Sequence, residues 1–315
     1  MREIGGYLEL ERYRLPMLHE NGIKLDCGRS CLAYLIRTRH IRKLAVPYFM
    51  CDSVFHLCGD YGVALRYYRV GLNLRPEPLE LAEDEWLYMM NYYGQLSLQE
   101  ILACRQRYGR VIVDNVQAYF DEPAEGVDTL YTCRKFFGVP DGAVLMTDTA
   151  LEEEPERGES FEHMEYLLGR FERTASEFYA KSVENNRRFR HAPIRRMSAL
   201  TENLLHGIDY ADVKRRRTEN FAALAARLGP INELKLQPTE GAFAYPLLIE
   251  GGAALKKRLI EKKIYVPTLW PNVPESVPRD WPEYRLVTDL LPLPCDQRYG
   301  AEEMEYIAGA VLGAV

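Results

Sequence analysis

Two residues stand where a catalytic acid and a catalytic amine could meet. Lys135 lies among aromatic and small residues in "YTCRKFFGVPDGAV", and Asp114 ends the apolar run of "RVIVDNVQAYF". Burying an unpaired ammonium is costly and lowers its pKa, so such a lysine has an accessible neutral form. A neutral lysine amine can condense with an aldehyde, and an aspartate beside a pyridine nitrogen keeps that nitrogen protonated.

A third group could bind an anion. Gly28, Arg29 and Ser30 directly precede an apolar helical segment in "KLDCGRSCLAYLI". The start of a helix offers free backbone N–H groups and a positive dipole end to a phosphate. An amine, an acid and a phosphate cradle together are what pyridoxal 5'-phosphate (PLP) requires.

Each of these residues also has an ordinary structural interpretation. An aspartate at a strand end is commonly a helix cap or turn residue, and Gly-Arg-Ser before a helix is commonly just a capped start. A single lysine is usually a solvated surface side chain.

The first half of the chain alternates between strand-like and helix-like segments, which predicts β-α-β units and a mainly parallel sheet. Ser97, Glu100 and Gly109 supply the start and stop signals of a helix over 97–109. The predicted strands are 44–49, 63–70, 85–93, 110–115, 128–133 and 142–148. In such sheets ligands bind beyond the carboxyl ends of the strands, where Asp114, Thr132 and Lys135 fall.

The second half is first helical and then mixed. Residues 160–228 carry apolar residues at helical spacing, and the charge run "KRRR" at 214–217 reads as a solvated helix face. The pieces "LKLQP", "AFAYPLLIE" and "KKIYVPTLW" look like strands, around a helix at 252–262 and before a helix in "AEEMEYIAGAVLG". We expect a three-layer α/β/α large domain over 20–225 and a small α+β domain over 226–315, with segment 1–19 packing on the small domain.

Charge and cysteine spacing limit the kinds of ligand that we expect. The 315 residues carry a formal charge of −6, which leaves no basic surplus for nucleic acid. We see no membrane span and no signal peptide, and the seven scattered cysteines include no Cys-x-x-Cys pair. We therefore expect a cytoplasmic protein with no metal and with small-molecule ligands.

The motifs resemble one family. "DNVQA", "YTCRKFFGVPDGAV", "NYYGQLSLQEI", "RRMSALTENLL" and "CGRSCLAYLI" are similar in order and approximate spacing to blocks of the DegT-type aminotransferases, which are fold-type I PLP enzymes of sugar and antibiotic pathways. The resemblance runs from about Gly22 to the final helix.

The resemblance implies roles for individual residues. Lys135 matches the lysine that forms a Schiff base with PLP and moves a proton at the substrate carbon, and Asp114 matches the partner of the pyridine nitrogen. Gln117 matches the residue beside the cofactor's 3'-oxygen. The phosphate-loop positions correspond to Gly28, Arg29 and Ser30. Members of the family work as homodimers, so we expect a homodimer.

Three departures concern the phosphate and the ring. Leu130 stands where the family has a phosphate-binding serine, which leaves Thr132 as the nearest substitute, and Ile194 stands where members often carry an asparagine that reaches the neighbouring subunit. Cys51 occupies the position at which the family has an aromatic residue that stacks on the pyridine ring, which leaves Phe49 or Tyr48 as candidates for that role. Arg29 replaces a small residue and could restore charge pairing to the phosphate.

The resemblance implies a PLP-dependent aminotransferase that moves an amino group from a donor such as glutamate to a keto or aldehyde acceptor on a sugar or related metabolite. A non-catalytic relative that acts as a binding or scaffold protein is the alternative. A nucleotide-binding oxidoreductase is disfavoured, because "CGRSCL" is not a Gly-x-Gly-x-x-Gly turn. Arg66, Arg196 and Arg298 are candidate contacts for an anionic substrate.

Overall fold

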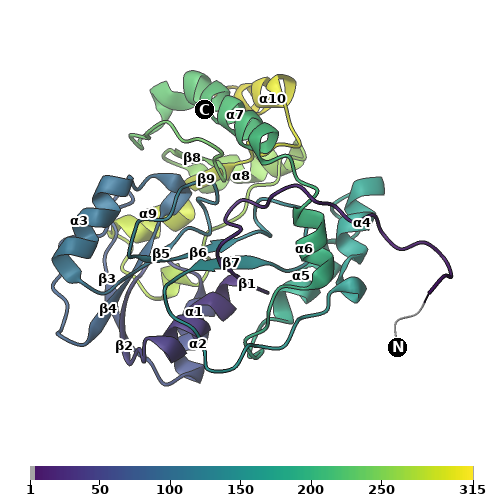
Figure 1. Ribbon diagram of the computed structural model, residues 1–315. Helices are drawn as coiled ribbons and strands as arrows, with labels where there is room; N and C mark the ends of the chain where they lie inside the picture. Colours follow the sequence, from purple (N-terminus) through teal and green to yellow (C-terminus); the bar gives the residue numbers. More distant parts are fainter. Residues whose placement is uncertain (1–3, 315) are drawn as a thin grey trace.

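The structure is a computed structural model that describes residues 4–314. A sheet with helices on both sides forms the larger unit, and a smaller unit containing α7, α8 and α10 lies above it in Figure 1. The N-terminal segment runs past α6 and α4 and leaves the body of the molecule (Figure 1).

The larger unit is built on a seven-stranded sheet in the order β1-β7-β6-β5-β4-β2-β3. Strands β2 to β6 pair in parallel, whereas β7 is antiparallel to both β6 and β1. This confirms the predicted α/β class and the mainly parallel sheet. The strands are β1 (Ile23–Leu25), β2 (Lys43–Pro47), β3 (Ala64–Tyr68), β4 (Glu85–Met90), β5 (Val111–Asp114), β6 (Asp128–Thr132) and β7 (Ala143–Met146).

All six strands expected in this half are present, but β1 was not predicted. With 3 residues it is too short to show a period, and its pairing with β7 defines it. The predicted helix over 97–109 is confirmed as α3, in which Ser97 and Glu100 form a capping box and Gly109 ends the helix at a φ of 73°. The helices of this unit are α1 (Gly28–Thr38), α2 (Asp52–Asp60), α3 (Leu98–Tyr108), α4 (Glu165–Glu172), α5 (Tyr179–Arg187) and α6 (Ala199–Leu205).

Both faces of the sheet are covered, because successive side chains of a strand point to opposite faces. In β5, Ile112 packs with the core that α1 and α2 cover, while Val111 and Val113 pack with the core that includes Ile101 of α3. Strands β2 and β4 alternate in the same way. The larger unit is therefore a three-layer α/β/α arrangement, as expected.

The smaller unit surrounds an antiparallel pair of strands, β8 and β9. From residue 210 onward the chain forms α7 (Tyr210–Leu228), β8 (Tyr245–Leu248), α8 (Gly252–Glu261), α9 (Pro282–Thr288), β9 (Leu290–Leu293) and α10 (Ala301–Leu312). Helices α7, α8 and α10 pack around β8 and β9, whereas α9 packs into the core of the large sheet through Leu286 and Val287. Short 3-10 turns occur at Tyr92–Gly94, Phe161–His163, Gly229–Ile231 and Val273–Glu275.

Two predicted strands of this unit are wrong. In "LKLQP", the backbone of Gln237 bonds to the Gln95 side chain and not to a neighbouring strand. Gln237 N donates to Gln95 Oε1 at 2.8 Å, and Gln237 O accepts from Gln95 Nε2 at 3.2 Å. In "KKIYVPTLW", Pro267 has no N–H for a strand ladder, and the segment is irregular. The helices predicted at 252–262 and in "AEEMEYIAGAVLG" are confirmed as α8 and α10.

The boundary expected between residues 225 and 226 falls inside α7. Phe221, Leu224 and Leu228 of this helix pack in the core of the smaller unit. We therefore propose that the smaller unit begins near residue 210.

The N-terminal segment, expected on the small domain, contacts the larger unit instead. Residues 1–3 lie outside the described residues. Leu15 N donates to His206 O at 3.0 Å, and Tyr13 N donates to Asn203 Oδ1 at 3.1 Å, so residues 13–15 pack at α6.

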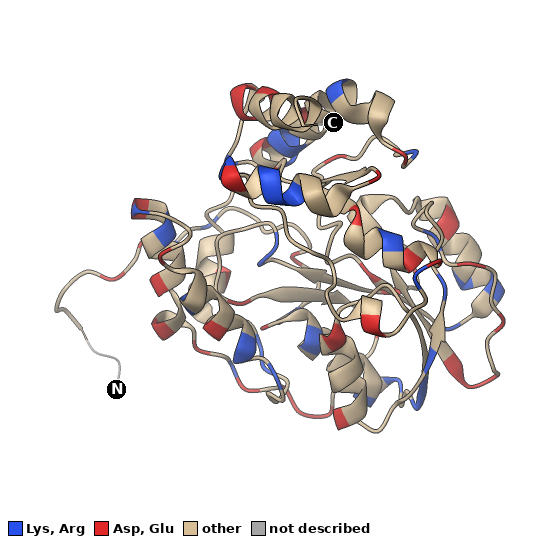
Figure 2. Ribbon diagram, turned by 180° about the vertical axis from the view of Figure 1, so that it is seen from behind, with Lys and Arg blue, Asp and Glu red and all other residues tan. Residues whose placement is uncertain are grey.

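The run "KRRR" is not wholly a solvated face, because Arg217 is only 2% exposed. Along the ribbon in Figure 2, acidic and basic residues are mixed, with neither sign confined to one part of the chain. Among residues 4–314, no helix combines the length and the apolarity needed to cross a bilayer.

Candidate active site

A cavity of about 760 Å³ opens at the carboxyl ends of the central strands. Its wall includes residues at or just beyond the ends of β2, β4, β5 and β6: Met50, Cys51, Met90, Asp114, Thr132 and Lys135. The start of α1, the helix α2, the chain from α5 to residue 193, and Trp270 complete it. Its size and its place beyond the strand ends are those of a small-molecule site in an α/β protein.

Lys135 lies in a tight turn that follows β6. The backbone N–H groups of Phe136 and Phe137 donate to Cys133 O at 3.0 and 2.8 Å. Phe136 O in turn accepts from Arg217 Nη2 at 3.2 Å and from Gln297 Nε2 at 2.8 Å. The smaller unit thus holds the turn that carries the lysine.

The Lys135 side chain is accessible, but the access is into the cavity. Its Nζ lies 5.7 Å from the ring centroid of Phe243, and within residues 4–314 no hydrogen bond or ion pair holds the amine. The loss of bulk water lowers the pKa of Lys135, and the nearby Asp114 carboxylate opposes that shift. The amine therefore reaches its neutral form at a lower pH than a surface lysine does.

Asp114 is buried at the end of β5 and also lines the cavity. Its Oδ2 accepts from the Tyr88 hydroxyl at 2.6 Å, and its Oδ1 accepts from Val116 N at 2.9 Å. Burial raises the pKa of Asp114, whereas Lys135 and these two hydrogen bonds lower it. The carboxyl group is thus held in one orientation, next to the strand that leads to Lys135.

The expected phosphate cradle also lines the cavity: Gly28, Arg29 and Ser30 form the start of α1, and Thr132 ends β6. The two hydroxyl groups have partners within the protein. Ser30 Oγ donates to Asp26 Oδ1 at 2.5 Å, and Thr132 Oγ1 is 3.5 Å from Gly142 O, a weak contact. Free donors at this end are the first backbone N–H groups of α1.

Two expected cofactor contacts lie behind the wall of the cavity. Gln117 is buried and its Oε1 accepts from Tyr93 N at 3.0 Å. Phe49 packs on Tyr92 and on Trp270, with ring centroids 5.2 and 5.0 Å apart. Of the aromatic rings in this group, Trp270 lines the cavity, so a ring-stacking role for Phe49 and a 3'-oxygen contact for Gln117 stay predictions.

Two of the three positions that depart from the family pattern lie at the cavity. Leu130 and Cys51 both line the cavity, whereas Ile194 is buried in the core beside α1 and α2. The candidate substrate arginines lie elsewhere: Arg66 pairs with Glu85 at 2.6 Å, Arg298 with Asp296 at 2.7 Å, and Arg196 with Glu154.

Sequence reasoning missed a basic wall on one side of the cavity. Arg134, on the same turn as Lys135, faces this space together with Arg187, Arg190 and His191. The dense charges of "NNRRFRHAPIRR" were the available signal, but their spacing does not reveal which ones face inward. Trp270 was missed because it follows an irregular, proline-containing segment.

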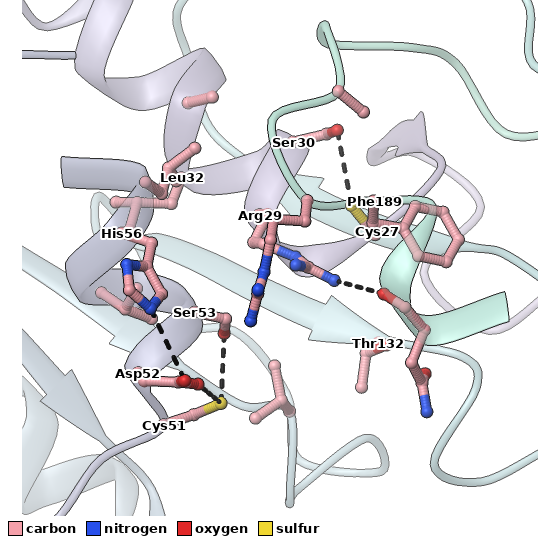
Figure 3. Close-up of a pocket in the computed structure, with 18 of the residues that line it drawn as sticks. Cys27, Arg29, Ser30, Leu32, Cys51, Asp52, Ser53, His56, Thr132 and Phe189 are labelled. Atoms are coloured by element: carbon pink, nitrogen blue, oxygen red, sulfur yellow. Dashed lines mark hydrogen bonds and ion pairs between the residues drawn. The ribbon is translucent and has the colours of Figure 1, made fainter. Parts of the chain in front are cut away.

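The α2 side of the cavity is polar. Ser53 Oγ donates to Cys51 Sγ at 3.2 Å, and His56 Nε2 lies 3.6 Å from Asp52 Oδ2. Figure 3 shows Asp52, Ser53 and His56 across the pocket from Phe189 and Thr132. Among the described residues no cluster of three or more His, Cys, Asp or Glu side chains could hold a metal ion.

Comparisons with known proteins show a fold and no close sequence relative. No protein-family model matches the chain, and no curated protein does. The sugar aminotransferase CalS13 from Micromonospora echinospora superposes with a TM-score of 0.66 and 13% identity, over 94% of this chain and 88% of that chain.

Two further solved structures agree. A DegT DnrJ EryC1 StrS aminotransferase from Brucella abortus gives a TM-score of 0.63 at 15% identity, over 93% of this chain and 85% of that chain. Bacillus subtilis NtdA with bound cofactor PMP gives 0.67 at 13% identity, over 92% of this chain and 72% of that one. The chain therefore has the fold-type I architecture seen in the DegT-type sugar aminotransferases, at a sequence identity of 13% and 15% to the first two of these structures.

Proposed function

We propose that this protein is a PLP-dependent aminotransferase. It takes an amino group from an amino-acid donor, expected to be glutamate, and gives it to a keto or aldehyde acceptor such as a sugar. The observation that carries the proposal is that Lys135 and Asp114, from adjacent strand ends, face the same cavity.

The residues at the cavity fit PLP. Lys135 offers an amine with a lowered pKa to the aldehyde, and Asp114 offers a fixed carboxylate to the pyridine nitrogen. The start of α1 and the basic wall offer donors to the phosphate. When bound, the cofactor supplies an electron sink for the carbanion at the substrate carbon.

The chain's own residues perform the remaining tasks. Lys135 takes up and returns the proton at the substrate carbon, for which a depressed lysine pKa is suited. The bonds from Tyr88 and Val116 hold the Asp114 carboxyl group in one orientation and oppose the rise in its pKa that burial causes. Phe243 lies beside the amine of Lys135, and Trp270 lines the cavity, so both place apolar surface next to the reacting groups.

The structural neighbours support the proposal at the level of the fold. CalS13 is described as a sugar aminotransferase, and NtdA is described with bound PMP, the amine form of the cofactor. Because one fold hosts several chemistries, the reaction itself rests on the placement of Lys135 and Asp114 and not on the likeness.

A half-reaction assay tests the proposal. PLP-loaded protein is mixed with single amino donors, glutamate first, while the spectrum of the cofactor and the formation of 2-oxo acid are followed. We expect spectral conversion with at least one donor and matching oxo acid, and neither with Lys135→Ala. Oxo acid no higher than with Lys135→Ala for every donor would overturn the aminotransferase assignment.

The non-catalytic alternative rests only on the replaced phosphate contacts at Leu130 and Ile194. It predicts a protein that stays colourless after PLP is added. A homodimer and a cytoplasmic location remain proposals that rest on the resemblance, and light scattering of the purified protein tests the first.

A further inference from the structure

Three arginine side chains meet at the anion end of the cavity. Arg29, Arg134 and Arg188 all lie against the ring of Phe189, with their guanidinium carbons 5.8, 4.7 and 4.3 Å from its centroid. Arg188 has a counter-charge, because its Nη2 lies 3.8 Å from Asp141 Oδ2. Within residues 4–314, no carboxylate lies within ion-pair distance of Arg29 or Arg134.

Arg134 has an incomplete set of hydrogen bonds. One Nη2–H donates to Asn186 Oδ1, but its Nε is buried and has no hydrogen-bond partner among the described residues. A buried guanidinium N–H without an acceptor is costly, and a negative charge in the cavity that Arg134 lines would stabilise the cation. Burial and the neighbouring Arg29 lower the pKa of Arg134, and Asp141 at longer range opposes that shift.

The side-chain hydroxyl groups at this end supply little of the missing recognition, because Thr132 Oγ1, 3.5 Å from Gly142 O, is a single neutral donor. Ser30 Oγ already donates to Asp26, and the usual serine position is Leu130. A phosphate with two negative charges requires several donors, and arginine binds phosphate in bidentate geometry. Arg134 is adjacent in sequence to Lys135, so a group bound by both is held at two fixed points of one turn.

We propose that Arg134, assisted by Arg29 and the first N–H groups of α1, binds the phosphate of PLP in place of the serine and the neighbouring subunit's asparagine of the family. This inference rests on the proposed function. The cofactor's aldehyde and its phosphate are then both held from the turn that follows β6.

The test compares PLP with pyridoxal, which lacks only the phosphate. Spectral titration measures both dissociation constants for wild type, Arg134→Met, Arg134→Lys, and the control Arg37→Ala, which removes an exposed arginine at the far end of α1. For Arg134→Met we expect the PLP constant to rise about 10- to 100-fold and the pyridoxal constant to stay within about twofold. Arg134→Lys keeps the charge but cannot make two parallel hydrogen bonds to phosphate, so its PLP constant should lie between those of wild type and Arg134→Met. The PLP constant of Arg37→Ala should match wild type.

Two results would overturn the inference. An equal loss for PLP and pyridoxal would mean that Arg134 only supports the Lys135 turn, and no loss for either would mean that the phosphate is bound elsewhere. Failure of the proposed function looks different: wild type would react with neither ligand. Titration of wild type and Arg134→Met with inorganic phosphate then decides whether an anion site exists, since only a site at Arg134 weakens in the variant.

Discussion

The two ends of the cavity are built from different kinds of structure. At the amine end, Asp114 ends a strand that is hydrogen-bonded on both sides, and Lys135 lies on a turn held by Arg217 and Gln297. At the anion end, long arginine side chains come from a helix start and from the turn after β6. The amine end matches the family pattern and the anion end departs from it.

The difference shows what can change while the fold stays. A carboxylate must face one ring nitrogen and an amine must reach one aldehyde, so their positions are tied to the strands. A phosphate exposes several oxygens and can be bound by any sufficient set of donors around it. The same fold therefore leaves more freedom in the residues at the anion end than in those at the amine end.

The largest effect should come from Lys135. Lys135→Ala removes the only group proposed to bond covalently to the cofactor, so the absorbance of the PLP adduct should be lost completely. An unchanged circular dichroism spectrum would show that the chain still folds. An adduct band of wild-type intensity would mean that another lysine carries the cofactor.

Asp114→Asn should keep the adduct and lose the reaction. The amide has the shape of the carboxyl group but no charge to keep a ring nitrogen protonated, so we expect the half-reaction to slow about 10²- to 10⁴-fold. Stopped-flow spectroscopy with the preferred donor measures this. A slowing of less than about threefold, within the range expected of one neutral hydrogen bond, would remove Asp114 from the mechanism.

Arg217→Met tests whether the smaller unit holds the amine end in place. The change removes the bond of 2.8 Å that Arg217 donates to Ala242 O, and it leaves Phe136 O with the bond from Gln297 alone. The loss of these two bonds should lower the free energy of unfolding by about 1–3 kcal/mol, measured by urea denaturation. Arg215→Met, an exposed neighbour on α7, is the matched control and should unfold close to the wild-type midpoint. Equal urea midpoints for the two variants would mean that Arg217 does not stabilise the folded protein.

The coupling between Asp114 and Lys135 predicts a shift with pH. Asp114 raises the pKa of Lys135 against the effect of burial, so removing the carboxylate charge should lower that pKa further. The rate of reaction with pyridoxal, which requires the neutral amine, should therefore reach half its maximum at a lower pH in Asp114→Asn than in wild type. A shift to higher pH would contradict the placement of the two groups.

Thr132→Val should have the smallest effect. The hydroxyl is 3.5 Å from Gly142 O and is at most a secondary phosphate donor. PLP affinity should fall by no more than about tenfold and pyridoxal affinity should not change. If PLP affinity falls more in Thr132→Val than in Arg134→Met, Thr132 and not Arg134 is the main phosphate contact.

The amine end was predictable from sequence because its signals are local. Asp114 directly follows an apolar run that forms β5, and Lys135 follows β6 at a turn rich in small residues. The sequence signals of the six predicted strands and of the caps of α3 are equally local. Strand β1 was not, since pairing with β7 and not its own composition defines it.

The remaining features depend on packing between distant segments. Arg217 reads as one charge in a run of four, and only its contacts with Phe136 O and Ala242 O show it to be buried. Arg134 faces the cavity because of the turn, and Trp270 reaches it from the smaller unit. Gln117 matches a family motif, yet its side chain bonds to Tyr93 N behind the wall.

The most direct test of the account is to locate the cofactor on the chain. Wild-type protein is incubated with PLP, reduced with borohydride, digested and mapped by mass spectrometry. The account predicts one phosphopyridoxyl group, on the peptide that contains Lys135. Label spread over surface lysines, or no label at all, would contradict it.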